Sequence, residues 1–138
     1  MRQVVADSNV FVSALVYGGK PLEVLEMGLE REIHLLTSPA ILEETLGVLR
    51  DKFRYTQEQI EESKLRIEVA CYGIFRPSVR LDVVKDDPDD NKVLELAVQM
   101  ADSVVVTGDK HLLELEEFQG VRIQRPAEFI AEFQSRGR

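Results

Sequence analysis

Short runs of apolar residues alternate along this chain with longer segments in which apolar residues recur every three or four positions. The short runs are rich in valine and isoleucine and predict strands, whereas the longer period predicts helices with one buried face. Strands are expected at 3–6, 33–37, 103–107 and 121–124, with a weaker edge strand near 79–81. Strands that alternate with helices build a mainly parallel sheet. The pattern therefore predicts an α/β fold, a three-layer α/β/α sandwich whose central sheet has four to five strands.

Polar caps and prolines mark where the predicted helices begin. Ser38 stands as a cap before a first-turn proline, Pro39, and Thr56 forms a capping box with Gln59. The helices are expected at 21–30, 39–51, 56–72 and 88–101, followed by a short helix at 109–115 and a last one from 126 to the residue before Ser135. We expect the two long helices at 39–51 and 56–72 to stand together as a hairpin beside the sheet.

The size and composition of the chain narrow its class. Its 138 residues match one compact domain, so 1–138 is expected to be a single domain. The 25 acidic and 17 basic side chains give a net charge of −8, which opposes the approach of a polyanion. The only cysteine is Cys71, so no internal disulfide is expected and a reducing compartment suits the chain. No apolar run has the length of a membrane span or the pattern of a signal peptide, so a cytoplasmic location is expected.

Two aspartates follow predicted parallel strands. Asp7 comes directly after the strand at 3–6, and Asp109 follows the strand at 103–107 with one glycine between them. Ligands of open α/β sheets bind in the crevice beyond the carboxyl ends of the strands. Taken singly, each aspartate is more often a helix cap than a ligand-binding residue. The sequence therefore indicates a site only if further acids reach the same edge of the sheet.

Two predicted helices supply such acids. Glu44 lies on the border of the apolar stripe of its helix, whereas Glu43 points away from that stripe. Asp90 lies within the apolar face of its helix, in the first turn, while Asp87 and Asp89 lie nearer the rim. A carboxylate on a buried helix face needs a partner. Both positions therefore favour a site that binds a cation.

Four carboxylates in one partly buried pocket would repel one another strongly, and cations would relieve that repulsion. Oxygen ligands without nearby histidine or cysteine suit Mg²⁺ or Mn²⁺. Two such ions about 4 Å apart would bind the attacking water, the scissile phosphate and the leaving oxygen of a phosphodiester. The predicted chemistry is hydrolysis of that bond without a side-chain nucleophile.

Four segments carry a family resemblance. They are DSNVFVSA at 7–14, SPAILEE at 38–44, DPDDN at 87–91 and VVTGDKHLL at 105–113. Together, and in this order over essentially the whole chain, they resemble the PIN domain, with a closer likeness to the VapC-like toxins of prokaryotic toxin–antitoxin pairs. Lys92 and Glu95 stand where many of these toxins have small apolar residues, which fits the subgroup with the Asp-Pro-x-Asp-Asn pattern.

The resemblance implies a metal-dependent endoribonuclease that cleaves RNA, binds a cognate antitoxin protein and forms homodimers. The four acids of the family match Asp7, Glu44, Asp90 and Asp109, as catalytic residues and metal ligands, and two supporting polar residues match Asn9 and Thr107. The helix-face argument also favours Asp90 over its two acidic neighbours as the third acid. The expected cofactor is Mg²⁺ or Mn²⁺.

Basic and apolar residues suggest where RNA and a second copy would bind. Lys52, Arg54 and Lys110 are candidate phosphate contacts at the rim, although the first two also suit the C-terminal end of a helix. The hairpin at 39–72 offers candidate dimer contacts at Leu46, Leu49, Phe53 and Ile60.

Other phosphate chemistries fit less well. A haloacid-dehalogenase-like phosphatase would have a second aspartate where this chain has Asn9, and a response-regulator receiver would need paired acids after its first strand. No P-loop or Gly-x-Gly-x-x-Gly motif occurs. The alternative that stays open is a non-catalytic PIN-like module that binds RNA or a protein.

Overall fold

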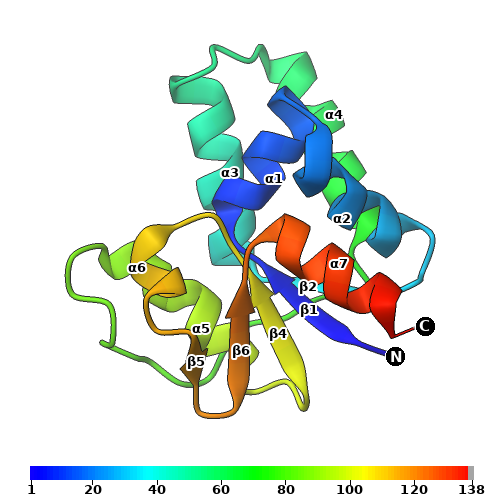
Figure 1. The fold of residues 1–138 in the computed structure, drawn as a ribbon. Coiled ribbons are helices and arrows are strands. Elements are labelled where there is room, and N and C mark those ends of the chain that lie inside the picture. Colours follow the sequence, from blue (N-terminus) through cyan, green and yellow to red (C-terminus); the bar gives the residue numbers. More distant parts are fainter. Residues whose placement is uncertain (137–138) are drawn as a thin grey trace.

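One six-stranded sheet forms the centre of the computed structural model, which describes residues 1–136 (Figure 1). In the order β3-β2-β1-β4-β6-β5, its strands are Gly73–Ile74, His34–Thr37, Gln3–Ala6, Ser103–Val106, Val121–Gln124 and Glu117–Phe118. All neighbours pair in parallel except β5 and β6, which form an antiparallel hairpin. The predicted mainly parallel α/β/α sandwich is confirmed, with six strands rather than four to five. The two additional strands, β3 and β5, have two residues each, too few to show a periodic pattern.

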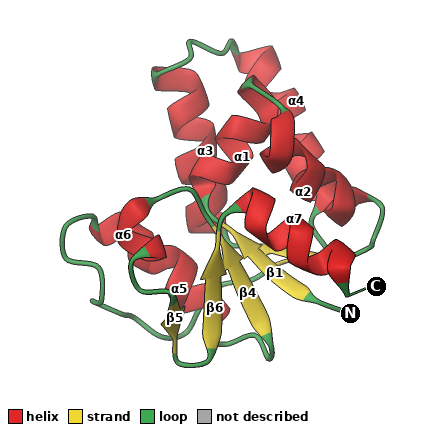
Figure 2. Cartoon of the chain, in the orientation of Figure 1, coloured by secondary structure: helices red, strands yellow, loops and turns green. Residues whose placement is uncertain are grey.

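Helices cover both faces of this sheet (Figure 2). They are α1 Ser8–Val16, α2 Gly19–Leu29, α3 Pro39–Asp51, α4 Gln57–Ala70, α5 Asn91–Ala97, α6 Lys110–Leu113 and α7 Pro126–Ser135, with a 3-10 turn at Pro88–Asp90. Figure 1 shows α7 in front of the sheet and α5 behind it, while α3 and α4 stand side by side above the sheet. The expected helical hairpin is confirmed. No helix within residues 1–136 has the length and apolar character needed to cross a membrane.

Helix α1 is absent from the sequence-based expectations. It starts directly after β1, where the side chain of Asp7 caps it by accepting a hydrogen bond from the backbone N–H of Ser8. Its side chains enter two separate cores, because Val10 and Phe11 pack in the main core and Val12 packs against α3 and α4. A helix buried on several sides lacks the polar face that would identify it in a sequence.

The predicted edge strand at 79–81 is wrong, because this segment pairs with a helix instead of the sheet. Residues 78–84, which we call the strap, run along α5 and the turn after it, and their backbone N–H groups donate to its side chains. Ser78 donates to Gln99 at 3.3 Å, Leu81 to Glu95 at 2.8 Å, and Val83 and Val84 both donate to Asn91 at 2.9 Å. The helix predicted at 88–101 is shorter than expected, since a 3-10 turn occupies Pro88–Asp90 and α5 ends at Ala97.

The apolar residues expected at a dimer contact lie mainly inside the chain. Leu49 is fully buried and Ile60 is 8% exposed, and both pack with Val12 in a second core between α1, α3 and α4. Leu46 and Phe53 are only partly exposed and pack against the same core. Leu49 and Ile60 are thus wrong as dimer contacts, because they hold the hairpin onto α1.

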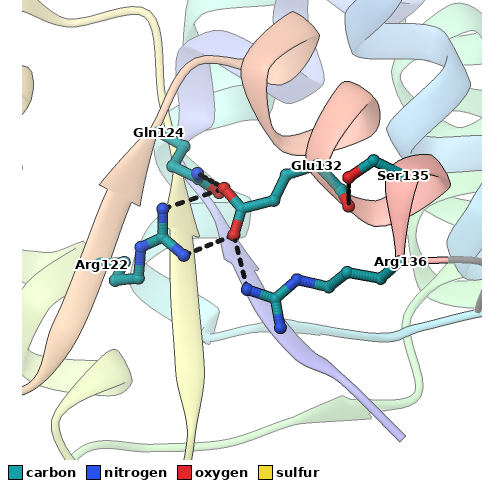
Figure 3. A network of polar contacts seen from close by, with 5 residues as sticks. All are labelled: Arg122, Gln124, Glu132, Ser135 and Arg136. Carbon is teal, nitrogen blue, oxygen red and sulfur yellow. Dashed lines mark hydrogen bonds and ion pairs between the residues drawn. The ribbon is translucent and has the colours of Figure 1, made fainter.

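Helix α7 is fixed to β6 by a cluster of polar side chains around Glu132 (Figure 3). Its carboxylate accepts hydrogen bonds from Arg122 at 2.9 Å, from Gln124 at 2.7 Å and from Arg136 at 3.0 Å. These donors, Arg122 above all, lower the pKa of Glu132 to about 2. The cluster fixes the direction in which α7 leaves the sheet, and so the position of its first turn.

We expect Gly28→Ala to destabilise the protein by about 1–3 kcal/mol, because a Cβ there overpacks the contact between α2, α4 and β2. That Cβ would lie 2.8 Å from the carbonyl oxygen of Ala70 and 2.8 Å from the Cβ of Leu35. Gly47→Ala, also inside a helix, is the matched control: its Cβ would meet only a guanidinium nitrogen of Arg50, at 3.7 Å. Removing that glycine should stabilise the helix by about 0.5–1 kcal/mol. Chemical denaturation of both variants measures the difference, and equal effects would contradict the packing argument.

Candidate active site

The carboxyl ends of β1 and β4 bring Asp7 and Asp109 to the same edge of the sheet, because the two strands are parallel neighbours. Each aspartate caps the helix that follows its strand. Asp7 accepts from the backbone N–H of Ser8 at 2.7 Å, and Asp109 accepts from that of His111 at 2.8 Å. Both aspartates therefore act as helix caps, as the sequence suggests for each alone, and they also lie together at one end of the sheet.

A polar network fixes the carboxylate of Asp7, which is only 2% exposed. Its Oδ2 accepts from the Asn9 side-chain amide at 2.9 Å and from the Thr107 hydroxyl at 2.8 Å. The Asn9 Oδ1 accepts from the backbone N–H of Gly108 at 3.1 Å, and the Thr107 oxygen accepts from that of Asp109 at 3.0 Å. Asn9 and Thr107 thus tie the loop after β4 to the start of α1.

Three carboxylates converge beside this network. Asp87, Asp90 and Asp109 each contribute one oxygen to a group in which all three oxygens lie within 4.8 Å of one another. Asp90 is 5% exposed, and its Oδ2 is buried without a hydrogen-bond partner within residues 1–136. A buried carboxylate oxygen without a partner is unusual and indicates a binding function.

Asp7 and Glu44 lie next to this group but not in it. The Ser8 hydroxyl donates to Glu44 Oε1 at 2.9 Å, while the Ser8 backbone N–H donates to Asp7. The negative charge of Glu44 raises the pKa of Asp7, and the charge of Asp7 raises that of Asp90. The four acids expected from the sequence are therefore neighbours, although only Asp90 and Asp109 belong to the closest group.

Burial is the main cause of the raised carboxyl pKa values. It raises the pKa of Asp7 to about 6, against the opposing effect of the hydrogen bonds from Thr107 and Ser8. It also raises the pKa of Asp90 to about 8, where the adjacent carboxyl group of Asp109 and the charge of Asp7 act in the same direction. The pKa of Glu44 is raised, again mainly by burial. The folded chain thus holds these acids near one another only at a cost in electrostatic free energy.

The donor set fits a hard divalent cation. The three converging atoms are carboxylate oxygens, and one of the side chains, Asp90, has an oxygen that no group within residues 1–136 satisfies. Mg²⁺ and Mn²⁺ bind through such ligands. Asp87, Asp90 and Asp109 could hold one ion directly, and Asp7 and Glu44 stand close enough to act on it by charge.

The predicted substrate contacts divide into two groups. Lys110 is the first residue of α6, directly after Asp109, and it is exposed. Lys52 and Arg54 follow the far end of α3, roughly 12 Å or more along the helix axis from Glu44. The structure therefore brings Lys110 to the acids, while Lys52 and Arg54 lie away from them.

Sequence reasoning missed two charged residues of this region. Asp87 was expected nearer the rim but is a member of the converging group. Lys92 forms an ion pair with Asp89 at 3.1 Å, and its charge partly offsets the rise in the pKa of Glu44 that burial causes. The available signal for Asp87 was its place before Pro88, because a proline after it favours a turn rather than a continued helix. That turn is the 3-10 turn that carries Asp87 and Asp90 toward Asp109.

We expect the metal-free protein to become less stable as the pH rises. A carboxyl group whose pKa is raised on folding stabilises the folded state fully below its unfolded pKa of 3.8, and this contribution is lost as the pH rises through the folded pKa, about 6 for Asp7 and about 8 for Asp90. In EDTA, the Tm should therefore be lower at about pH 9 than at about pH 6.

Asp90→Asn removes the group that contributes most to the loss of stability of the metal-free protein at high pH. At about pH 9 it should raise the Tm of the metal-free protein by roughly 3–6 °C and flatten the dependence on pH. Asp102→Asn, in the exposed turn before β4, is the control and should change neither the Tm nor its dependence on pH. A lower Tm for Asp90→Asn, measured by calorimetry, would contradict the interpretation that its charge is held in the fold against repulsion.

Comparison with known proteins agrees with this geometry. No curated protein matches the chain. A family model described as PIN domain matches residues 3–111, which include all five acids at the sheet edge. PIN domains are generally metal-dependent nucleases, and the converging aspartates fit that chemistry. The chain belongs to the PIN domain family.

Proposed function

We propose that this protein is a Mg²⁺- or Mn²⁺-dependent endoribonuclease and that residues 1–138 act as one nuclease domain. The observation that supports it most directly is the unpaired, buried Oδ2 of Asp90 in a group of three carboxylates at the end of the parallel sheet. In this proposal the catalytic acids and metal ligands are Asp7, Glu44, Asp90 and Asp109, joined by Asp87.

The residues around these acids would keep them in place for catalysis. Asn9 and Thr107 hold one oxygen of Asp7, and the Ser8 backbone holds the other, so the carboxylate has little freedom to rotate. Ser8 also holds Glu44 through its hydroxyl. A bound divalent ion would supply charge stabilisation for the phosphate and an activated water. In this proposal Lys110, the residue after Asp109, contacts a phosphate of the substrate.

The test of this proposal is cleavage of a defined single-stranded RNA. We expect the wild type to cut internal bonds with Mg²⁺ or Mn²⁺ and to lose activity in EDTA. Asp7→Asn and Asp90→Asn should each lower kcat by roughly 10²-fold or more, because each removes a charge that the reaction centre needs. Asp51→Asn, an exposed acid at the end of α3, is the control.

Gel analysis of end-labelled RNA and of DNA of the same sequence measures the products. Equal, metal-independent cleavage by the wild type and Asp7→Asn would reject the proposal. Binding without cleavage under every metal condition would instead favour the non-catalytic RNA- or protein-binding module.

The finer proposal is that the protein is the cytoplasmic toxin of a toxin–antitoxin pair, acting as a homodimer with a cognate antitoxin as its partner. The likeness of its four motif segments to VapC-like toxins supports it. Since Leu49 and Ile60 lie within the chain, a dimer contact would use other exposed apolar residues, such as Leu65 and Val69 on α4.

Induced expression in a bacterial host tests the toxin role. We expect the wild type to arrest growth and Asp7→Asn to be harmless at the same protein level. Normal growth with active wild-type protein would separate a housekeeping nuclease from a toxin.

A further inference from the structure

A groove of about 260 Å³ opens beside the acids, on the other side of Asn9. Its walls come from the first turns of α1, α2 and α7 and from Gly108 in the loop after β4. Asn9 is the shared wall, since its amide nitrogen donates to Asp7 while its Oδ1 accepts from the Gly108 backbone. Whatever occupies the groove therefore lies one side chain away from the proposed reaction centre.

The lining of the groove combines apolar surface with two cations. Val10, Pro21 and Pro126 contribute apolar surface, and Lys20 and Arg125 stand on two different elements. Within residues 1–136, no ion pair forms with the guanidinium of Arg125.

Glutamates lie near both of these cations and bear on the charge of the groove. Glu23 pairs with Lys20 at 3.1 Å, but both side chains are about half exposed, so this pair is weak. Glu128 accepts from the backbone N–H of Arg125 at 3.3 Å. Arg125 also borders a second hollow that is lined by Glu116 and Glu117. Because the Arg125 guanidinium forms no ion pair within residues 1–136, Arg125 is still the stronger of the two candidate anion contacts.

The net negative charge of the molecule explains why a bound RNA strand would need these two cations. A net charge of −8, with five acids gathered at the sheet edge, opposes the approach of RNA. The basic residues Lys52 and Arg54 follow the far end of α3 and do not offset this repulsion at the acids. Lys20 and Arg125 lie in a groove that shares a wall with the acids, where a bound strand would need positive charge.

We propose that this groove binds the nucleotide next to the cleaved bond, with its base or ribose against the apolar walls and its phosphates on Lys20 and Arg125. This inference rests on the proposed ribonuclease function and names a second binding site for the same strand. The cluster around Glu132 (Figure 3) ties α7 to β6, and Arg125 and Pro126 stand at the start of that helix.

The first experiment is steady-state cleavage of a quenched fluorescent RNA in Mn²⁺ by Lys20→Gln and Arg125→Gln. We expect KM to rise roughly fivefold or more for each variant while kcat changes less than about twofold, because a phosphate contact outside the reaction centre acts mainly on binding. The slope of log(kcat/KM) against log[salt] should fall in magnitude by about 0.7 for each lost contact. Lys64→Gln, an exposed cation on α4, is the matched control and should change neither quantity.

A steric pair of variants tests the groove itself. Ala127 lines it at an exposed position of α7, and Ala131, one turn later and also exposed, does not. Ala127→Trp should lower kcat/KM about tenfold or more, whereas Ala131→Trp should leave it unchanged, with the same Tm for both.

The outcomes separate this inference from the proposed function. If the wild type cleaves RNA with metal but Lys20→Gln, Arg125→Gln and Ala127→Trp behave as their controls do, the groove is not a substrate site and the nuclease proposal stands. If hexaglutamate peptide inhibits cleavage and loses this effect in Arg125→Gln, while the KM for RNA is unchanged, the groove binds a protein segment and the inference is overturned. If the wild type cleaves no RNA, both proposals fail together.

Discussion

Buried negative charge that the chain itself does not balance is the constraint on which the rest of this structure depends. Asp7 and Asp90 are nearly inaccessible, and burial shifts the pKa of each upward. A fold that keeps two such carboxylates close together must hold them by other means, because their mutual repulsion favours separation. Parallel pairing of β1 and β4 at the centre of the sheet provides the rigid base for this arrangement.

Short-range contacts around the first turn of α1 carry most of that restraint. Ser8 and Asn9 each bridge an acid to a second group, Ser8 to Glu44 and Asn9 to the loop at Gly108. Two consecutive residues thus join β1, α3 and the loop after β4. Asn9 also lines the adjoining groove, so the same side chain borders both the cluster of acids and that groove.

Much of this site was predictable from the sequence, for identifiable reasons. Asp7 and Asp109 follow apolar runs that alternate with helical patterns and so predict parallel strands, whose carboxyl ends share one edge of the sheet. Asp90 follows from helix periodicity. The position of Asp87 does not follow from helix periodicity. It precedes Pro88, where the chain makes a 3-10 turn before α5 begins.

The remaining errors also have physical causes. Helix α1 carries no polar face, since its side chains enter two cores. The strap has the composition of a strand, and its alternation of apolar and polar residues holds, but its backbone donors are taken by side chains of Asn91, Glu95 and Gln99. A strand-like pattern predicts that the backbone of an extended segment forms hydrogen bonds with the backbone of a neighbouring strand. The sequence carries no signal that side chains will accept these hydrogen bonds instead.

That mode of attachment has a consequence for evolution. Side chains of α5 accept hydrogen bonds from backbone N–H groups of the strap. These hydrogen bonds do not depend on which side chains the strap carries, provided that no proline removes a donor. The exposed positions 78–80 and 82 are thereby free to vary, whereas Leu81, Val83 and Val84 also pack in the main core. Sequence drift at those exposed positions would leave Asp87 in place.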